Sequence, residues 1–216
     1  MRKNLDACLV LARIIEARNP YTYRHSARVA VLASRFGGFL GLGAEMVEAL
    51  RLGSLLHDVG KVGVPDAILL KPGPLDVEEI VCLREHPAIG WRIVEPLGLK
   101  PALLEIVLHH HERWDGGGYP GGLAGGAIPL AARVVALADA YDAMLSERPY
   151  RSRLSGEAAR REILARAGSH FAPDLAPAFV EFLDAIPAGG ECWPEVAAAL
   201  AVGWPVREPD RPRERA

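Results

Sequence analysis

Cysteine is scarce in this 216-residue sequence, in which Cys8, Cys82 and Cys192 lie far apart and form no CxxC pair. An odd, dispersed set argues against a disulfide framework and against a structural zinc site, and it fits a reducing compartment. The sequence also lacks an excess of either charge, because 25 basic and 27 acidic residues leave a formal net charge of -2. No basic field therefore predicts a nucleic-acid polymer as a partner. A small anionic substrate needs only a local cationic patch and is still allowed.

Long apolar runs are missing as well. A membrane-spanning helix needs about 20 consecutive apolar residues, and no run in the sequence approaches that length. The N-terminal stretch MRKNLDACLVLARIIEAR is interrupted by Asp6, Arg13 and Glu16, which is typical of neither a signal peptide nor a membrane anchor. We therefore expect a cytoplasmic protein that has no membrane partner.

Apolar residues recur at helical spacing through most of the sequence, and no strand pattern or internal repeat is found. The expected helices lie at residues 5–17, 25–41, 44–57, 76–84, from 87 onward, 101–111, 130–146, 156–167, 173–186 and 196–202. Thr22 is expected to cap the second helix, and the third is expected to be central and mostly buried. Residues 62–75 predict a loop, and Asp76 with Glu79 predicts a capping box. The fold class is therefore all-α, a helical bundle with one long Gly-rich loop.

Histidines and carboxylates recur at the ends and on the inner faces of these helices. Imidazole and carboxylate ligands suit zinc, manganese or iron(II). The set is too large for one ion, but a carboxylate such as Asp58 can bridge two, and paired ions about 3.5–4 Å apart are common in phosphoryl chemistry. The candidate metal ligands are His25, His57, Asp58, His86, His110, His111 and Asp139.

Each of these residues also has a simpler interpretation. His25 alone is more typical of a hydrogen-bonded core histidine, and His57-Asp58 could merely end a helix. His86 could simply precede a helix. Asp139 and Asp142 share one face of their helix, so at least one of the two carboxylates is expected to point inward, although Asp139 could lie on a solvated face. Their occurrence together favours metal ligation. His109 is interpreted as a supporting or packing residue, and a surface position is expected for His170.

The stretch LHHHERWDGGGYP joins the triple histidine to a Gly-rich turn. Glycines let backbone N–H groups approach a phosphate. Glu112 and Asp115 are expected to orient histidines or to hold the loop. Lys61, in HDVGK, is placed to contact a phosphate, although an exposed loop lysine is an equally good interpretation of that residue alone.

The sequence resembles the HD-GYP domain family, the bacterial branch of the HD hydrolase superfamily that acts on cyclic di-GMP. Five stretches between residues 21 and 171 carry the resemblance: YTYRHSARVA, LLHDVGKVGVPDAILLKPGPL, EHPAIG, HHERWDGGGYP and ARVVALADAYDAMLSERPYR. The resemblance implies a phosphodiesterase that converts cyclic di-GMP to linear pGpG, to GMP or to both. A hydroxide held between two metal ions would be the nucleophile.

The resemblance also implies a role for each motif residue. One ion would be held by His25, His57, Asp58 and Asp139, and the other by His86, His110 and His111 with Asp58 shared. Asp58 and Lys61 would be catalytic, and substrate would contact Lys61, Gly118, Tyr119, Pro120, Arg148 and Arg151. Two divalent ions, iron or manganese, are expected; a third is not, because Tyr21 stands where some members carry a glutamate.

Other functions stay open at this point. The same site could hydrolyse another cyclic dinucleotide or a phosphate ester, or the domain could sense a cyclic dinucleotide without turnover. A homodimer and a separate regulatory partner are both compatible with the sequence. The expected organisation is a packing helix over residues 1–20, the HD-GYP catalytic domain over 21–186, a short helix within 187–204 and a disordered tail over 205–216.

Overall fold

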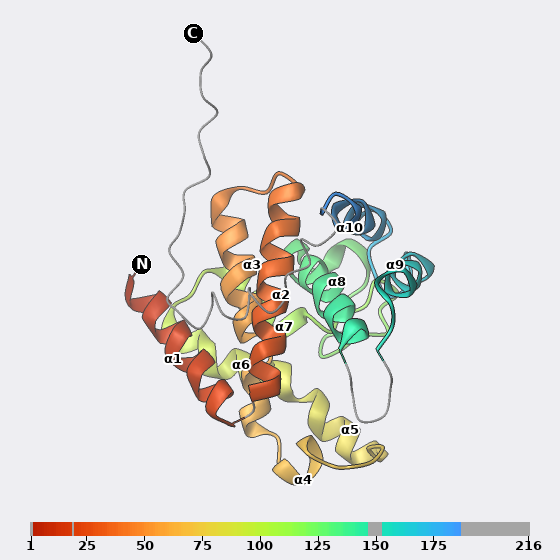
Figure 1. Ribbon diagram of the computed structural model, residues 1–216. Coiled ribbons are helices and arrows are strands. Elements are labelled where there is room, and N and C mark those ends of the chain that lie inside the picture. The colour runs from red at the N-terminus through yellow and green to blue at the C-terminus, as the bar shows by residue number, and fades with distance from the viewer. Residues whose placement is uncertain (1, 19, 147–152, 187–216) are drawn as a thin grey trace.

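The computed structural model describes residues 2–18, 20–146 and 153–186, which form helices and the loops between them (Figure 1). The α-helices are α1 (Arg2–Arg18), α2 (Pro20–Phe39), α3 (Ala44–Leu56), α4 (Asp66–Leu69), α5 (Val77–Arg84), α6 (His86–Val94), α7 (Pro101–His109), α8 (Leu130–Leu145), α9 (Gly156–Ala165) and α10 (Leu175–Asp184). Three short 3-10 helices join them: η1 (Val59–Gly63), η2 (Glu95–Leu97) and η3 (Gly125–Ala127). Over these ranges there is no strand, so the all-α prediction is confirmed. The expected helix at 196–202 and the tail at 205–216 lie outside the described residues.

Helix α2 runs between two apolar cores. On one side Val29 and Phe36 pack with residues of α8, α9 and α10. On the other side Ala27 and Ala30 pack with residues of α1, α3, α6 and α7. Both faces of α2 are therefore shielded from water, and Figure 1 shows α2 alongside α3 at the centre of the bundle.

The prediction that the third helix is mostly buried is only half right. Its first half carries Glu45 and Glu48, both exposed, and burial begins at Ala49. The two carboxylates keep this half in water. No helix among the described residues has the length and apolar character needed to cross a bilayer.

Two predicted boundaries need correction. Thr22 does not cap the second helix, because α2 begins at Pro20, a residue suited to a first helical turn since it has no N–H to leave unpaired. The stretch predicted as loop at 62–75 contains the end of η1 and the short helix α4. The capping box is confirmed, because the Asp76 side chain accepts from the Glu79 N–H and the Glu79 side chain accepts from the Asp76 N–H, both at 2.9 Å.

The turn η1 meets α6 backbone to backbone. A Cβ atom on Gly60 would lie 1.9 Å from the carbonyl oxygen of His86 and 2.4 Å from the backbone nitrogen of Gly90. Only a residue without a side chain permits this approach. The contact fixes His57 and Asp58, which lie between α3 and η1, against the start of α6, which carries His86.

Candidate metal centre

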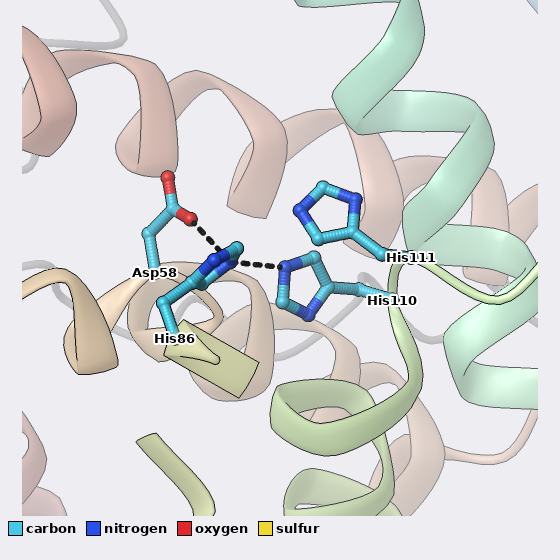
Figure 2. A group of neighbouring side chains, drawn as sticks. All are labelled: Asp58, His86, His110 and His111. Carbon is cyan, nitrogen blue, oxygen red and sulfur yellow. Dashed lines mark hydrogen bonds and ion pairs between the residues drawn. The ribbon is translucent and has the colours of Figure 1, made fainter. Parts of the chain in front are cut away.

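Side chains from five separate segments converge beside η1. Figure 2 shows Asp58 and His86 facing His110 and His111, which follow the last turn of α7. One ligand atom from each of these four residues lies within 4.8 Å of the others. The same holds for a second group, His25, His57 and Asp58. Asp58 belongs to both groups.

The hydrogen bonds of the imidazole rings determine which ring nitrogen is free. Three rings place Nδ1 on a backbone carbonyl oxygen: His57 on Ser54 at 2.6 Å, His86 on Leu83 at 2.8 Å, and His110 on Ile106 and Val107 at 3.1 Å each. A carbonyl oxygen can only accept, so Nδ1 carries the proton in each ring. In a neutral ring this leaves Nε2 with a free lone pair.

These lone pairs point at one another and at a carboxylate. The Nε2 atoms of His86 and His110 are 3.3 Å apart. Asp58 Oδ1 lies 3.3 Å from His86 Nε2, and Asp58 Oδ2 lies 3.5 Å from His57 Nε2. Electron pairs that converge in a buried space repel unless a cation lies between them, so this donor set fits divalent metal ions. Each Asp58 oxygen faces a different group of histidines, as a bridging carboxylate would.

The fifth segment is α8, which supplies Asp139 and Asp142 one turn apart. His25 Nε2 lies 2.9 Å from Asp139 Oδ1, and His25 Nδ1 lies 2.7 Å from Asp142 Oδ2. Arg28, one turn beyond His25 on α2, donates to both oxygens of Asp142 at 2.6 and 2.9 Å. From the sequence at least one of the two carboxylates was expected to point inward, and both do.

Burial sets the protonation of the histidines. Burial lowers the pKa of His111 to about 3. It also lowers the pKa of His110 to well below the usual value and lowers the pKa of His57. Burial by itself also lowers the pKa of His25, but hydrogen bonds to two carboxylates raise the pKa of that ring to about 9. Near neutral pH the rings of His57, His110 and His111 are therefore neutral and can bind a cation. His25 Nε2 must first release its proton.

The carboxylates stay ionised. Burial raises the pKa of Asp58, yet nearby Lys61 and His57 bring the pKa of Asp58 well below its usual range. Burial likewise raises the pKa of Asp139, and the hydrogen bond and charge of His25 reverse that effect and lower it far below the ordinary value. The site thus holds its negative charge across the physiological pH range.

We predict that the metal-free protein loses stability in mild acid. Below about pH 6.5 the unfolded chain protonates His57, His110 and His111, while the folded chain keeps them neutral, so each lowered pKa contributes stability above pH 6.5 that is lost as the pH falls. Each ring should contribute about 1.4 kcal/mol per pH unit. His25 acts in the opposite sense, because its stabilisation is present below pH 6.5 and disappears as the pH rises through about 9.

Urea unfolding of the chelated protein at pH 6.5, 5.5 and 4.5 measures this effect. His110→Asn should make the decline shallower, because it removes one of the titrating rings. A free energy of unfolding that is constant over this range would contradict the protonation states described above.

The centre is not sealed from solvent. The side chains of Asp139 and Lys61 are 17% and 27% exposed, which leaves one side of the ligand groups accessible. Lys61 Nζ donates to Asp58 Oδ2 at 2.6 Å. A surface pocket next to Asp58 is lined by Ile15, Arg18, Thr22, Lys61, Val62 and Leu69. A substrate could therefore reach the ligand groups from the side on which Lys61 lies.

Two carboxylates hold the Gly-rich loop. Buried Glu112 accepts from the backbone N–H groups of Gly121 at 2.7 Å and Leu123 at 3.0 Å. Asp115 accepts from the N–H of Gly117 at 2.9 Å and pairs with Arg113. Both residues hold the loop, which is one of the two roles expected from the sequence.

The loop returns tightly onto the centre. A Cβ on Gly118 would lie 2.3 Å from the backbone nitrogen of Arg113, so the turn requires glycine at this position. The ring of Tyr119 stacks on His111, with 4.8 Å between centroids. The guanidinium of Arg84, on α5, lies 5.1 Å from the centroid of the same tyrosine ring. Tyr119 and the adjoining Pro120 are therefore placed beside the candidate ligands.

The structure brings together all seven candidate ligands named from the sequence, and their role as ligands stays a prediction. Arg148 and Arg151 lie outside the described residues. His170 is half-buried rather than on the surface, because its ring packs on Phe171 and its carbonyl oxygen accepts from Trp114 of the Gly-rich loop. His109 lies beside Glu112, with 3.6 Å between Nδ1 and Oε1.

Two residues of the site were not anticipated from the sequence. Arg28 carried a usable signal, since it lies one helical turn beyond His25 and therefore on the same face. The sequence gives no signal for the role of Arg84, because its contact with Tyr119 depends on how α5 packs near the Gly-rich loop.

Residues 9–175 match the family described as HD domain. The chain is 42% identical over 175 residues to a cyclic di-GMP phosphodiesterase of Thermotoga maritima, an alignment that covers 80% of this chain and 47% of that relative. It is 39% identical over 176 residues to a 3'3'-cGAMP-specific phosphodiesterase 2 of Vibrio cholerae, covering 81% of this chain and 34% of the relative. The chain spans about half or less of the length of these curated relatives.

A solved structure of a cyclic GMP-AMP-specific phosphodiesterase from V. cholerae, V-cGAP3, has a similar fold. Its TM-score is 0.61 at 21% sequence identity, and the match covers 93% of this chain and 51% of that one. The helical fold of this chain is therefore shared with that solved structure.

Proposed function

The chain belongs to the HD domain family, and from this premise we propose that it is a metal-dependent phosphodiesterase of the HD-GYP type that hydrolyses cyclic di-GMP. The observation that carries the proposal is the position of Asp58, whose two oxygens face two separate groups of buried imidazoles. Relatives named as cyclic di-GMP phosphodiesterases support the choice of substrate. The products would be linear pGpG, GMP or both.

We assign two divalent ions to the centre, iron or manganese. One would be held by His25, His57, Asp58 and Asp139, and the other by Asp58, His86, His110 and His111. Two ions of this kind lower the pKa of a coordinated water and neutralise charge on a phosphodiester. The neutral rings of His57, His110 and His111 and the ionised carboxylates are in the protonation states that such ligation requires, and His25 reaches the same state once its Nε2 releases its proton.

The remaining residues would bind and orient the substrate. Lys61 carries a positive charge beside Asp58, where it can pair with a phosphate oxygen. The backbone of Gly118 and the ring of Tyr119, next to Pro120, border the ligands from the loop side. Arg148 and Arg151 are assigned to the substrate phosphates on the family resemblance alone. A cytoplasmic location is consistent with the free thiols of Cys8 and Cys82.

Lys61→Met tests the phosphate contact. The substitution removes the ammonium and keeps the aliphatic stem, so kcat/KM should fall about 10- to 100-fold, the effect of losing a hydrogen bond to a charged group. Metal content should stay near the wild-type value. Lys100→Met is a matched control, since Lys100 pairs with Glu45 on the surface. An unchanged kcat/KM in Lys61→Met would show that Lys61 does not contact the substrate.

The function itself is tested with one sample of protein purified without oxygen and analysed for metal. That sample is offered cyclic di-GMP, 3'3'-cGAMP, cyclic di-AMP and a simple phosphate monoester, and the products are separated. Fastest turnover of cyclic di-GMP is expected. The named specificity of the V. cholerae relative makes 3'3'-cGAMP the second candidate. Tight binding without product, in fully metallated protein, would instead favour a sensing module and overturn the proposal.

A further inference from the structure

The imidazole of His25 differs from its neighbours in what its Nδ1 atom contacts. His57, His86 and His110 place Nδ1 on backbone carbonyl oxygens. His25 places it on the carboxylate of Asp142, at 2.7 Å. A carboxylate is a stronger acceptor than a carbonyl oxygen, so it fixes the ring more firmly and makes Nε2 a better electron donor.

Asp142 is itself held in place. It is 4% exposed, and Arg28 donates to its two oxygens through Nε at 2.6 Å and Nη2 at 2.9 Å. The same Arg28 nitrogen, Nη2, also lies 3.2 Å from the hydroxyl of Ser146. Asp142 follows Asp139 by three residues on α8. One helical turn therefore supplies both a candidate ligand, Asp139, and the carboxylate that orients His25.

We propose that Asp142 is a positioning residue of the metal centre, and that Arg28 holds it in the orientation that turns His25 Nε2 toward the ion. The inference rests on the proposed function, since it assumes that His25 is a ligand. Asp142 touches neither ion nor substrate in this assignment. It acts by keeping the proton on Nδ1 and fixing the plane of the ring. The effect of losing it should therefore be confined to the ion held by His25, His57, Asp58 and Asp139.

A purely structural role is the competing explanation, because the contact of Arg28 with Asp142 also joins α2 to α8. Such a clamp would change the free energy of unfolding and leave the affinity of the folded protein for metal unchanged. Metal affinity therefore separates the two explanations, whereas activity alone does not.

The test is a competition between the full chain and a chelator for Mn²⁺, with bound metal counted per chain. The wild-type protein should bind two ions. In Asp142→Asn one ion should bind about 10- to 100-fold more weakly, the usual effect of removing a group that orients a ligand, and the other should be unaffected. Arg28→Lys keeps the charge but not the two-pronged contact, so it should weaken the same ion by a smaller factor.

Glu48→Gln is the matched control. It removes a carboxylate on α3 that Arg51 contacts through two nitrogens, as Arg28 contacts Asp142. It should bind both ions as the wild type does. The positioning role is overturned if folded Asp142→Asn binds both Mn²⁺ ions with affinities within about twofold of the wild type. If Asp142→Asn does not fold, the same criterion applies to folded Arg28→Lys. If the wild-type protein itself binds fewer than two ions, the proposed function fails instead.

Discussion

Replacing Asp58 by alanine is expected to remove bound metal and hydrolysis of cyclic di-GMP together. Asp58 is 2% exposed, and its two oxygens face both groups of histidines, so its loss deprives each ion of a ligand. Ions of this kind contribute several kcal/mol to phosphoryl transfer, and each 1.36 kcal/mol is a factor of ten. The rate should therefore fall by at least about 10³-fold. Elemental analysis and the hydrolysis assay on the same sample measure both losses.

His57→Ala should also lose both bound metal and hydrolysis, because His57 and His25 are assigned as ligands of the same ion. Asp58→Asn keeps the shape of the side chain and serves where the alanine variant does not fold. Glu157→Ala is the control, since Glu157 is a largely exposed carboxylate that pairs with Arg161 on the same helix, α9. Turnover near the wild-type rate in folded Asp58→Ala or His57→Ala would refute the assignment of the site.

Gly60→Ala is expected to destabilise the protein and to disturb the centre at the same time. The added Cβ would lie 1.9 Å from the carbonyl oxygen of His86, and a backbone atom cannot rotate away as a flexible side chain can. Overpacking of this kind should cost about 3 kcal/mol, which corresponds to a fall in Tm of roughly 6–12 °C for a domain of this size. Because η1 and α6 must separate, Asp58 should also move away from His86.

Thermal unfolding and metal content should therefore fall together in Gly60→Ala. Gly73→Ala is the matched control, since a Cβ there meets no atom within 4 Å, and its Tm should stay close to that of the wild type. A Gly60→Ala protein with wild-type Tm and metal content would mean that η1 and α6 do not depend on their close contact.

Most of the fold could be predicted from helical periodicity, and the candidate site could be predicted from the residue types and their order. His25 was predicted from its place on an apolar helical face and Asp139 from its residue type within the ligand set, and both point inward. The exposed first half of α3 was missed, because a count of apolar residues does not say which of them a neighbouring helix covers. The start of α2 at Pro20 was missed because Thr22 offered a capping signal that the chain does not use.

The contacts that refine the site could not be predicted from spacing alone. The pairing of Asp142 with Arg28 joins α2 to α8, and the approach of Arg84 to Tyr119 joins α5 to the Gly-rich loop. Such contacts depend on how distant helices pack. The seven candidate ligands could be named in advance because their residue types, histidine and aspartate, are visible in the sequence residue by residue.

The most direct test of the dimetal centre is the metal content of the full chain purified without oxygen, measured by elemental analysis against protein concentration. We expect two equivalents of iron or manganese per folded chain, both removed by a chelator and both restored by adding the metal back. Folded protein that takes up one equivalent or none, even with excess metal, would contradict the arrangement in which Asp58 links two ions.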